Sequence, residues 1–434
     1  MLITTSLSCG VTDNLIGTLA GQTTGGGGET PLGGAEMQGG TAENGTGGTA
    51  GSLPSAVGGG AGSGLIAGGN DNAGSSFAGA PELDSAGAPG VTFTNAVDYQ
   101  IGQSPRGLAL ADLDADGRLD LVVANWDSSS VSVFRGVGDG TFSDRVDYPT
   151  SYKANSLALA DLNSDGRLDI ALVAYESETL KVMLGASDRT FGPTVEVFGR
   201  PEMFSVTSGD VNNDGALDLV TAPGTKGSAS VFVGTGDGQF APPKDFATGG
   251  ASFSVALGDV NADGNLDLAR VNSENQSVTL MFGAGDGSFP DSKEYATGAH
   301  PIFVTFDDLN RDGKLDLVTA DTDANEVGVR LSTDEGDFGP RVAYATESFP
   351  TYVLFSDLNG DRALDLLVVN AYDNSVSVRA GSGDGTFGSK LDYATGFGPT
   401  QAATGDLNGD AIPDLVVTNS LSGSMTVLLG ARPN

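Results

Sequence analysis

Seven short acidic segments carry the residues of this chain whose types and spacing could do chemistry. Their first aspartates recur every 49 residues, at Asp112, Asp161, Asp210, Asp259, Asp308, Asp357 and Asp406. In each segment Asp or Asn stands at positions 1, 3, 5 and 9, and in the first five segments position 6 is Gly. Side-chain oxygens at this spacing, with a backbone carbonyl at position 7, can wrap a hard cation with about six or seven oxygen ligands. The pattern therefore predicts a calcium site in each segment, up to seven in all.

The predicted calcium ligands are the carboxylate and amide side chains at these four positions. They are Asp112, Asp114, Asp116 and Asp120; Asp161, Asn163, Asp165 and Asp169; Asp210, Asn212, Asp214 and Asp218; Asp259, Asn261, Asp263 and Asp267; Asp308, Asn310, Asp312 and Asp316; Asp357, Asn359, Asp361 and Asp365; and Asp406, Asn408, Asp410 and Asp414. Magnesium demands a stricter octahedron, and softer metals prefer His or Cys, of which the chain has one each. The alternative is a solvated acidic turn that binds nothing, but the crowded carboxylates would then repel one another.

The sixth and seventh loops depart from this pattern, because position 6 is Arg362 or Ala411 in place of Gly. If that position needs a positive φ, a residue with a Cβ costs roughly 1 kcal/mol there. Gly360 and Gly409, two residues earlier, would relieve part of that cost. We expect these two loops to bind calcium more weakly, and Pro413 makes the seventh the weakest candidate.

The elements that must position these loops repeat with the same period. An alternating apolar segment precedes each loop, and a continuous apolar run such as Leu366 to Val369 follows it. A third alternating segment comes next, and then a Gly-Asp-Gly turn and an aromatic residue lead into a fourth. Four short strands per repeat without helical periodicity describe a propeller blade. Proline opens the first strand in four repeats, at Pro105, Pro301, Pro350 and Pro399.

The phase of the repeats predicts how the ring closes. The Phe that opens the fourth strand recurs from Phe142 to Phe387, and Phe93 lies 49 residues before the first of them. The last repeat ends where its own fourth strand would begin, so Thr92 to Tyr99 is expected to supply it and to remove the exposed edges. We therefore predict an all-β fold over residues 92–434, a seven-bladed β-propeller of four-stranded antiparallel blades closed by an N-terminal strand.

Residues 1–91 contain no Lys or Arg and are rich in Gly, Thr and Ser. Such a composition buries too little apolar surface to offset the entropy of ordering, so it predicts a disordered, flexible tether. The short apolar stretch that ends at Cys9 resembles the end of a bacterial lipoprotein signal, whose Cys would be lipidated. The missing basic region and the short apolar part favour the alternative, an ordinary free Cys.

Composition excludes several classes of function. The chain has 21 Lys and Arg against 56 Asp and Glu, a formal net charge of −35, which disfavours nucleic acid and anionic membranes as partners. One Cys excludes an internal disulfide framework, and one His excludes a multi-histidine metal site. No apolar run approaches the roughly 18 residues of a transmembrane segment. We expect a monomer.

The loop Asp-x-Asn-x-Asp-Gly-x-Leu-Asp, the apolar strand after it and the turn Gly-x-Gly-Asp-Gly-Thr-Phe together resemble the FG-GAP or VCBS repeat family. Its relatives include the head domain of integrin α subunits and some seven-bladed fungal lectins. The resemblance covers residues 92–434 and implies a calcium-stabilised propeller that works outside the cell or at its surface in adhesion, recognition or polysaccharide attachment. The resemblance does not identify a ligand for this chain, because members of the family bind many different ligands.

The loops on the face opposite the predicted calcium loops vary most between repeats. Ligand-binding candidates there are Trp126, Tyr175 and Tyr372, since aromatic rings on polar loops suit sugar stacking or protein contacts; the alternative for Trp126 and Tyr175 is packing. The aromatic residues near the inter-blade links are expected to pack against the neighbouring blade. They are Phe204, Phe253, Phe349 and Phe397. His300 is interpreted as a turn histidine and not as a catalytic base.

These patterns favour a calcium-stabilised, non-catalytic binding or adhesion module for a carbohydrate or an extracellular protein. The alternative is a polysaccharide-active enzyme, a lyase or hydrolase, on the same scaffold. Against it, nearly all clustered carboxylates belong to the predicted metal loops and the single histidine has no evident catalytic partner. A calcium sensor is disfavoured because a rigid ring of repeated sites lacks a bistable element.

Overall fold

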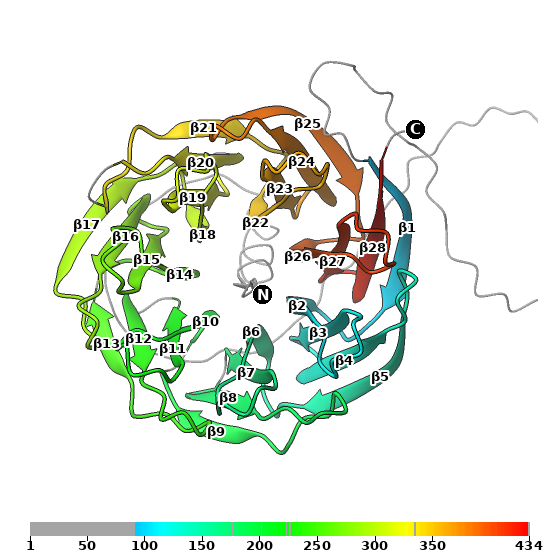
Figure 1. Ribbon diagram of the computed structural model, residues 1–434, viewed down its shortest axis with the longest axis horizontal. Coiled ribbons are helices and arrows are strands. Elements are labelled where there is room, and N and C mark those ends of the chain that lie inside the picture. Colours follow the sequence, from blue (N-terminus) through cyan, green and yellow to red (C-terminus); the bar gives the residue numbers. More distant parts are fainter. Residues whose placement is uncertain are drawn as a thin grey trace, which may run out of the picture.

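The computed structural model describes residues 92–432, apart from 176, 201, 223, 225, 226, 248, 334 and 335. The predicted tether over residues 1–91, with Cys9, lies outside the described residues. The described part contains 28 strands in seven four-stranded antiparallel sheets, arranged as blades around a central axis (Figure 1). This confirms the predicted seven-bladed propeller. No described segment forms a helix with the length and apolar character needed to cross a membrane.

Each of the first six blades is a meander in which consecutive strands pair. Blade 1 contains β2 (Pro105–Ala111), β3 (Asp120–Asn125), β4 (Ser130–Gly136) and β5 (Phe142–Pro149). Blade 2 contains β6 (Ala154–Ala160), β7 (Asp169–Ala174), β8 (Thr179–Met183) and β9 (Val195–Phe198). Blade 3 contains β10 (Ser205–Gly209), β11 (Asp218–Ala222), β12 (Ser228–Phe232) and β13 (Lys244–Ala247). Blade 4 contains β14 (Val255–Gly258), β15 (Asp267–Asn272), β16 (Ser277–Phe282) and β17 (Asp291–Ala296).

The remaining blades follow the same order from the axis outward. Blade 5 contains β18 (Pro301–Asp307), β19 (Asp316–Asp321), β20 (Glu326–Arg330) and β21 (Val342–Ala345). Blade 6 contains β22 (Pro350–Ser356), β23 (Asp365–Asn370), β24 (Ser375–Gly381) and β25 (Phe387–Ala394). Blade 7 contains β26 (Pro399–Gly405), β27 (Asp414–Asn419), β28 (Ser424–Ala431) and, from the other end of the chain, β1 (Thr92–Gln100).

The ring closes through β1, as predicted. β1 lies beside β28 (Figure 1). Thr92 pairs with Ala431 and Gln100 with Ser424 in an antiparallel arrangement that a bulge interrupts after Thr94. A second contact joins the innermost strands of the last and first blades: the Gln401 side-chain oxygen accepts a hydrogen bond of 2.9 Å from the backbone N–H of Leu108. Blade 7 is therefore completed by residues from both ends of the propeller.

The second strand of each blade forms the core, because it is buried along its whole length. Every residue of β3 and of β23 is buried, as their continuous apolar runs predicted. Each buried Val or Leu side chain contributes about 1.5–3 kcal/mol through the hydrophobic effect. The fourth strands, by contrast, lie at the rim and are largely exposed, as in β5.

The prediction that every fourth strand opens at its Phe is correct only in part. It holds for β5 and β25, but Phe191, Phe240 and Phe338 make isolated bridges, and the strand resumes several residues later. β17 likewise begins after Phe289. The cause is proline, which cannot donate to the ladder and interrupts these four segments but neither β5 nor β25. The interrupting residues are Pro193, Pro242, Pro243, Pro290 and Pro340.

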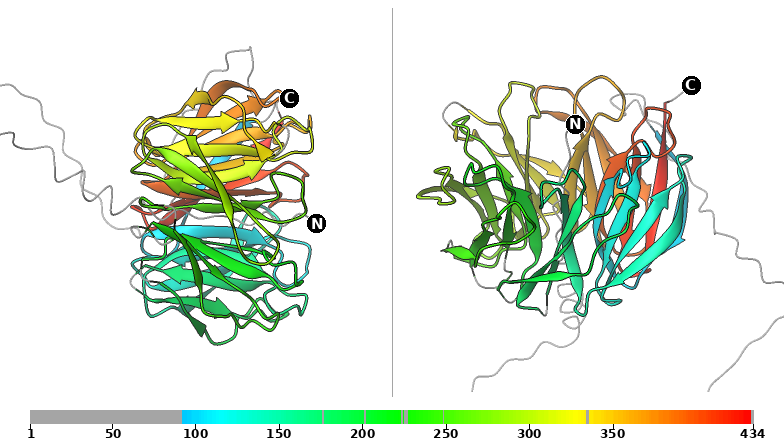
Figure 2. Two further views of the ribbon diagram at one scale, coloured as in Figure 1. Left: turned by 90° about the vertical axis from the view of Figure 1, so that its left-hand side faces the viewer. Right: turned by 60° about the horizontal axis from the view of Figure 1, so that its bottom comes forward.

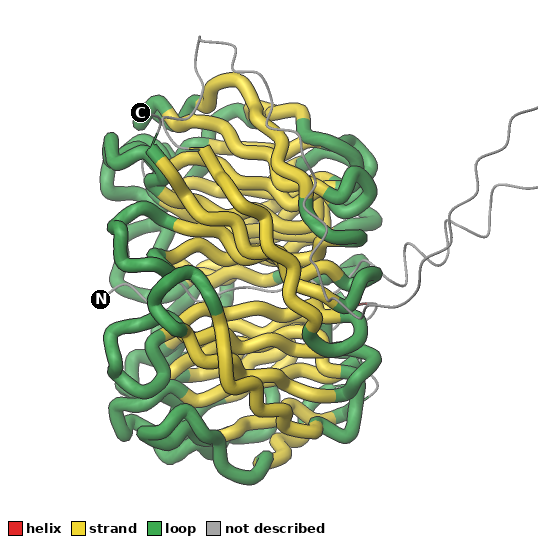
Figure 3. The backbone as a smooth tube through the Cα atoms, turned by 90° about the vertical axis from the view of Figure 1, so that its right-hand side faces the viewer, coloured by secondary structure: helices red, strands yellow, loops and turns green. Residues whose placement is uncertain are grey.

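The strands run between two faces of the ring, each edged by loops (Figures 2 and 3). The acidic face carries the acidic loops between first and second strands and the turns between third and fourth strands. The opposite face carries the loops between second and third strands and the links between blades. This division follows from the meander and matches the arrangement expected from the repeats.

Candidate functional site

The first aspartate of each acidic loop is held by backbone N–H groups of its own loop. Asp112 accepts hydrogen bonds from the N–H of Asp116 at 3.0 Å and from that of Gly117 at 2.9 Å. In all seven loops the second of these bonds, from position 6 to the carboxylate at position 1, measures 2.8–2.9 Å. The backbone thus fixes the position-1 carboxylate in the same place in every blade.

Positions 4 and 6 both have a left-handed backbone in all seven loops. At position 6, φ is 82–87° for the five glycines, 74° for Arg362 and 61° for Ala411. At position 4, φ is 56–61° in the first five loops and 79–80° for Gly360 and Gly409. Position 6 therefore does require a positive φ, and each loop supplies one glycine for two such positions. The sixth and seventh loops place it at position 4, so their backbones keep the path of the other five.

The aspartate at position 9 begins the second strand, and its side chain is fully buried in every blade. In blade 1, Asp120 accepts the backbone N–H of Leu113 at 3.1 Å on one oxygen and that of Gly136 at 2.9 Å on the other. Both bonds recur in all seven blades. This residue, predicted as a metal ligand, therefore also ties the loop to the end of the third strand. In six blades the residue that donates at the end of the third strand is a glycine, 16 residues after the position-9 aspartate. This spacing is the sequence signal for the contact.

Burial raises the pKa of the position-9 carboxyls, and the two N–H donors do not fully offset it. The pKa of Asp267, Asp316 and Asp365 rises to about 6. The carboxylates at positions 5 and 1 add to the increase, since negative charges nearby disfavour ionisation. A bound cation would reverse this effect by favouring the charged form.

Positions 3 and 5 complete the cluster of oxygens. In loop two, Asn163 donates to the Asp165 carboxylate at 3.0 Å and accepts the Asp165 N–H at 3.1 Å, and the same pair of bonds recurs in loops three to six. In loop one, carboxylate oxygens of Asp112, Asp114 and Asp116 lie within 4.8 Å of one another, a group that does not include Asp120.

The chemistry of these donors fits a hard divalent cation. They are carboxylate and amide oxygens, each with more than one lone pair, so an oxygen that accepts an N–H can also face a metal ion. When bound, such an ion would neutralise the crowded carboxylates and hold the loop. The predicted ligands at positions 1, 3 and 5 are thus brought together, and position 9 anchors them from the buried side.

Three acidic loops, those of blades 2, 3 and 7, also form a backbone hydrogen bond with the next blade. The N–H of Gly238, in the turn between the third and fourth strands of blade 3, donates to the carbonyl of Leu162 in the loop of blade 2 at 3.1 Å. Gly287 and Val211 make the same bond at 3.1 Å, and Gly140 bonds Leu407 across the ring closure at 2.9 Å. These three acidic loops therefore lie at blade junctions, where a cation would stabilise the contact between neighbouring blades.

On the opposite face, the Trp126 ring is buried and packed against other side chains. It is only 5% exposed, the Arg106 guanidinium lies 3.6 Å from its ring centroid, and Tyr175 packs against it at 5.3 Å. Of the two interpretations of Trp126, the structure favours packing over ligand stacking. Arg106 in turn donates to the Asn155 side chain of blade 2 at 2.9 Å.

Trp126 begins a row of aromatic contacts that crosses successive blades. The row continues from Tyr175 to Phe204, Phe253 and His300, with centroid separations of 5.0, 5.1 and 6.3 Å. The expectation that Phe204 packs is confirmed by its burial. His300 has a φ of 54° and its Nδ1 lies 3.1 Å from the Thr322 hydroxyl, which agrees with a histidine in a turn.

In the loops and the link of blades 6 and 7 on the opposite face, three large apolar side chains are exposed: Tyr372, Phe397 and Leu421, with exposures of 41%, 66% and 59%. We call these three together the apolar patch. Backbone hydrogen bonding joins Leu421 to Phe397 at 3.1 Å, and the Tyr372 ring stacks on the buried Phe349 at 4.4 Å. Packing was predicted for Phe349 and for Phe397. It is correct for Phe349 and wrong for Phe397, which stands on a link that leaves its ring in solvent.

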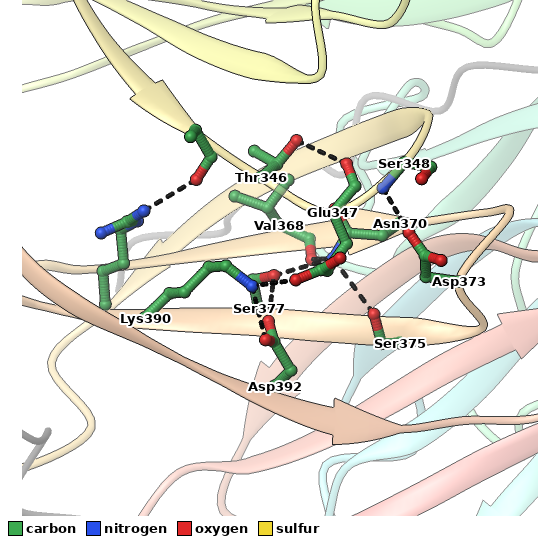
Figure 4. Close-up of polar contacts among 12 residues, drawn as sticks. Thr346, Glu347, Ser348, Val368, Asn370, Asp373, Ser375, Ser377, Lys390 and Asp392 are labelled. Atoms are coloured by element: carbon green, nitrogen blue, oxygen red, sulfur yellow. Dashed lines mark hydrogen bonds and ion pairs between the residues drawn. The ribbon is translucent and has the colours of Figure 1, made fainter. Parts of the chain in front are cut away.

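A polar network fixes the loop that carries Tyr372 (Figure 4). The Ser348 N–H donates to the Asp373 carboxylate, and Asn370 donates to Ser377 at 2.8 Å. Lys390 of β25 bridges Asp392 and Glu347, which belongs to the link from blade 5. The link before blade 6 and the loop that carries Tyr372 are therefore tied together.

A family model described as FG-GAP-like repeat matches residues 112–172, 165–221, 210–270, 259–319, 308–368 and 357–417. None of the curated proteins matches the chain.

Several solved structures have a similar fold. BBS1N in complex with ARL6DN is 12% identical with a TM-score of 0.57, and the match covers 79% of this chain and 97% of that one. An Agrocybe aegerita lectin that recognises non-reducing terminal N-acetylglucosamine is 18% identical with a TM-score of 0.52, covering 76% and 96%. Virginiamycin B lyase from Staphylococcus aureus is 12% identical with a TM-score of 0.55, covering 78% and 99%. These identities establish a shared fold alone.

Proposed function

The chain belongs to the FG-GAP-like repeat family, and on that premise we propose that its propeller is a calcium-stabilised, non-catalytic binding module that acts outside the cell or at its surface. The observation that carries the proposal is the division of the ring into two faces. The acidic face repeats the same loop seven times, whereas the opposite face differs from blade to blade. Repetition suits a structural role, and variation suits recognition of one ligand.

Calcium would act as a structural ion at the blade junctions. Its ligands would be the side chains at positions 1, 3, 5 and 9, whose oxygens the loop backbone already arranges, as around Asp161 in loop two. The supporting chemistry is the donor set itself, because hard oxygen ligands without His or Cys suit calcium. Residues 92–434 hold 49 Asp and Glu against 21 Lys and Arg, and this net charge of −28 also calls for counter-cations to limit self-repulsion in the compact ring.

The ligand would bind on the opposite face, at the apolar patch. Exposed aromatic rings that are fixed from beneath lose little entropy on binding, which suits stacking on a sugar or a contact with a protein. Tyr372 meets this condition, because Phe349 supports one side of its ring and the polar network holds its loop. The fold likeness to a lectin agrees with a carbohydrate ligand, and the likeness to BBS1N agrees with a protein ligand.

A glycan array in calcium buffer tests this proposal. We expect wild type to bind a defined glycan and the variants Tyr372→Ala and Phe397→Ala to lose that binding. The matched control is Val146→Ala, which truncates an exposed apolar residue on the outer strand β5, away from the patch. Retained binding in both patch variants would contradict the assigned surface. Cleavage of a bound polysaccharide would contradict the non-catalytic assignment. If the protein binds no glycan on the array, a protein ligand would be favoured.

A further inference from the structure

The first acidic loop differs from the other six in charge. Position 3 is Asp114 there and Asn in every other loop, so loop one alone carries four carboxylates. Two arginines in its surroundings also break the repeat. Arg135 stands on β4 where the other blades have Leu184, Val233, Phe282, Leu331, Ala380 and Leu429. Arg189 stands in the turn of blade 2 where the other turns have Gly140, Gly238, Gly287, Gly336 and Gly385.

Both arginines reach the carboxylates of loop one. Arg189 Nη1 lies 3.0 Å from an Asp114 oxygen, and both side chains are mostly buried, at 22% and 17% exposure. Arg135 Nη2 lies 3.3 Å from an Asp116 oxygen. Two residues that a cation would use, at positions 3 and 5, therefore already have guanidinium partners.

The backbone of Arg189 shows that this contact is maintained against strain. Its φ is 64°, a left-handed conformation that glycine adopts freely and that costs a residue with a Cβ roughly 1 kcal/mol. An arginine kept at a glycine position needs a compensating interaction. The ion pair with Asp114 supplies one, since opposite charges attract more strongly where they are partly shielded from water.

We propose that loop one is neutralised by the protein's own arginines and takes no calcium, so that Arg189 and Asp114 form a metal-independent lock between blades 1 and 2. The proposal rests on the calcium assignment for the other loops. The extra carboxylate at position 3 and the two arginines form one coordinated change: the acid adds a negative charge, and the guanidinium groups supply positive charge from the two elements that flank the loop. In the other six loops the residues that correspond to Arg135 and Arg189 are uncharged, and position 3 is an amide. Loop two has one guanidinium contact, from Arg167 of the same loop to Asp165 at position 5, and it crosses no blade junction.

The test is a count of bound calcium ions by equilibrium dialysis and native mass spectrometry. The double variant Arg135→Leu with Arg189→Gly restores residues found at the same places in other blades, and Arg189→Gly alone relieves a left-handed arginine and should fold. We expect the double variant to bind one more calcium ion than wild type. We also expect its melting temperature to fall below that of wild type in chelator and to recover in calcium. The matched control is Arg145→Leu, which removes a positive charge that pairs with Asp147 on β5 of the same blade; it should add no ion.

The outcomes separate this inference from the calcium assignment on which it rests. One additional ion in the double variant, with none in the control, supports the arginine lock. An equal number of ions in wild type and double variant, with binding clearly present, overturns the lock and leaves the calcium assignment intact. An absence of bound calcium in every protein overturns both.

Discussion

Gly360 and Arg362 have the same left-handed backbone, with φ of 79° and 74°, in the sixth acidic loop. In the first loop the same two conformations belong to Ala115 and Gly117. The loop path is therefore constant, and only the place of its single glycine changes. Every loop keeps one residue with a Cβ in a region that L residues avoid.

The first prediction is that Arg362→Gly stabilises the protein. Removing the Cβ from a left-handed position relieves roughly 1 kcal/mol of strain. We expect the free energy of unfolding in urea, with chelator present, to rise by up to about that amount. The matched control is Gly117→Ala, whose new Cβ would meet no atom within 4 Å and so adds only backbone strain. An unchanged or lower free energy for Arg362→Gly would contradict the prediction.

The second prediction concerns ring closure by β1. A chain that begins at Ile101 lacks the strand that covers β28 and presents an unpaired edge, which invites pairing with another molecule. We expect this truncation to form oligomers in light scattering and to melt at a lower temperature. A chain that begins at Thr92 keeps β1 and is the control; it should stay monomeric. If the shorter chain is also a monomer of unchanged melting temperature, closure by β1 is not required.

The fold could be predicted from the sequence because periodicity and alternation record it directly. A 49-residue period, apolar runs and the offset of Phe93 determine the number of blades, the buried strand and the closing strand. The first residues of the fourth strands are harder to predict, because a single proline such as Pro290 moves the start of the strand without changing the 49-residue repeat.

The candidate site could be predicted only where it depends on local spacing. The residues of each acidic loop are neighbours in sequence, so their convergence follows from the chain itself. The exposure of Trp126 and Phe397 depends on residues from other blades and links, and the expectations for these aromatics were therefore open or wrong. The pairing of Arg189 with Asp114 joins residues 75 positions apart in sequence and is visible only in three dimensions.

The third prediction is a pH dependence of the metal-free protein. The pKa of Asp267 and Asp316 rises to about 6 in the folded state, above the ordinary value of 3.8. The folded state thus holds protons that the unfolded state releases, so this stabilisation is complete below about pH 4 and is lost as the pH rises through about 6. We expect the melting temperature in chelator to rise when the pH falls from 7 to 5.

Two variants test how much of the trend comes from the position-9 carboxyls, since burial also raises the pKa of Asp307 and Asp321 and these two groups add to it. Histidine ordinarily titrates in the same range, so the measurement is made in a His300→Gln background. Asp267→Asn should reduce the dependence, because the amide does not titrate. Carboxyls with a lowered pKa, such as Asp337 at about 2, change stability only below about pH 4 and do not interfere. A melting temperature that is flat or falls between pH 7 and 5 would contradict the prediction.

The last prediction concerns calcium itself. A ligand that binds only the folded state stabilises it by RT ln(1 + [L]/Kd), which is about 2.7 kcal/mol per site when calcium is at 100 times its dissociation constant. Chelation should therefore lower the melting temperature sharply. Asn212→Ala removes one oxygen ligand from loop three, where the Asn212 side chain bonds Asp214.

This variant should shrink the difference in unfolding free energy with and without calcium by up to about 2.7 kcal/mol, the contribution of one site. Its stability in chelator should fall less, because only the two bonds to Asp214 are lost and both are exposed. Val146→Ala, which lies outside every acidic loop, should leave the calcium-dependent difference unchanged. Equal losses with and without calcium would show that Asn212 supports the loop as a turn residue alone, and the solvated-turn interpretation would then hold for loop three.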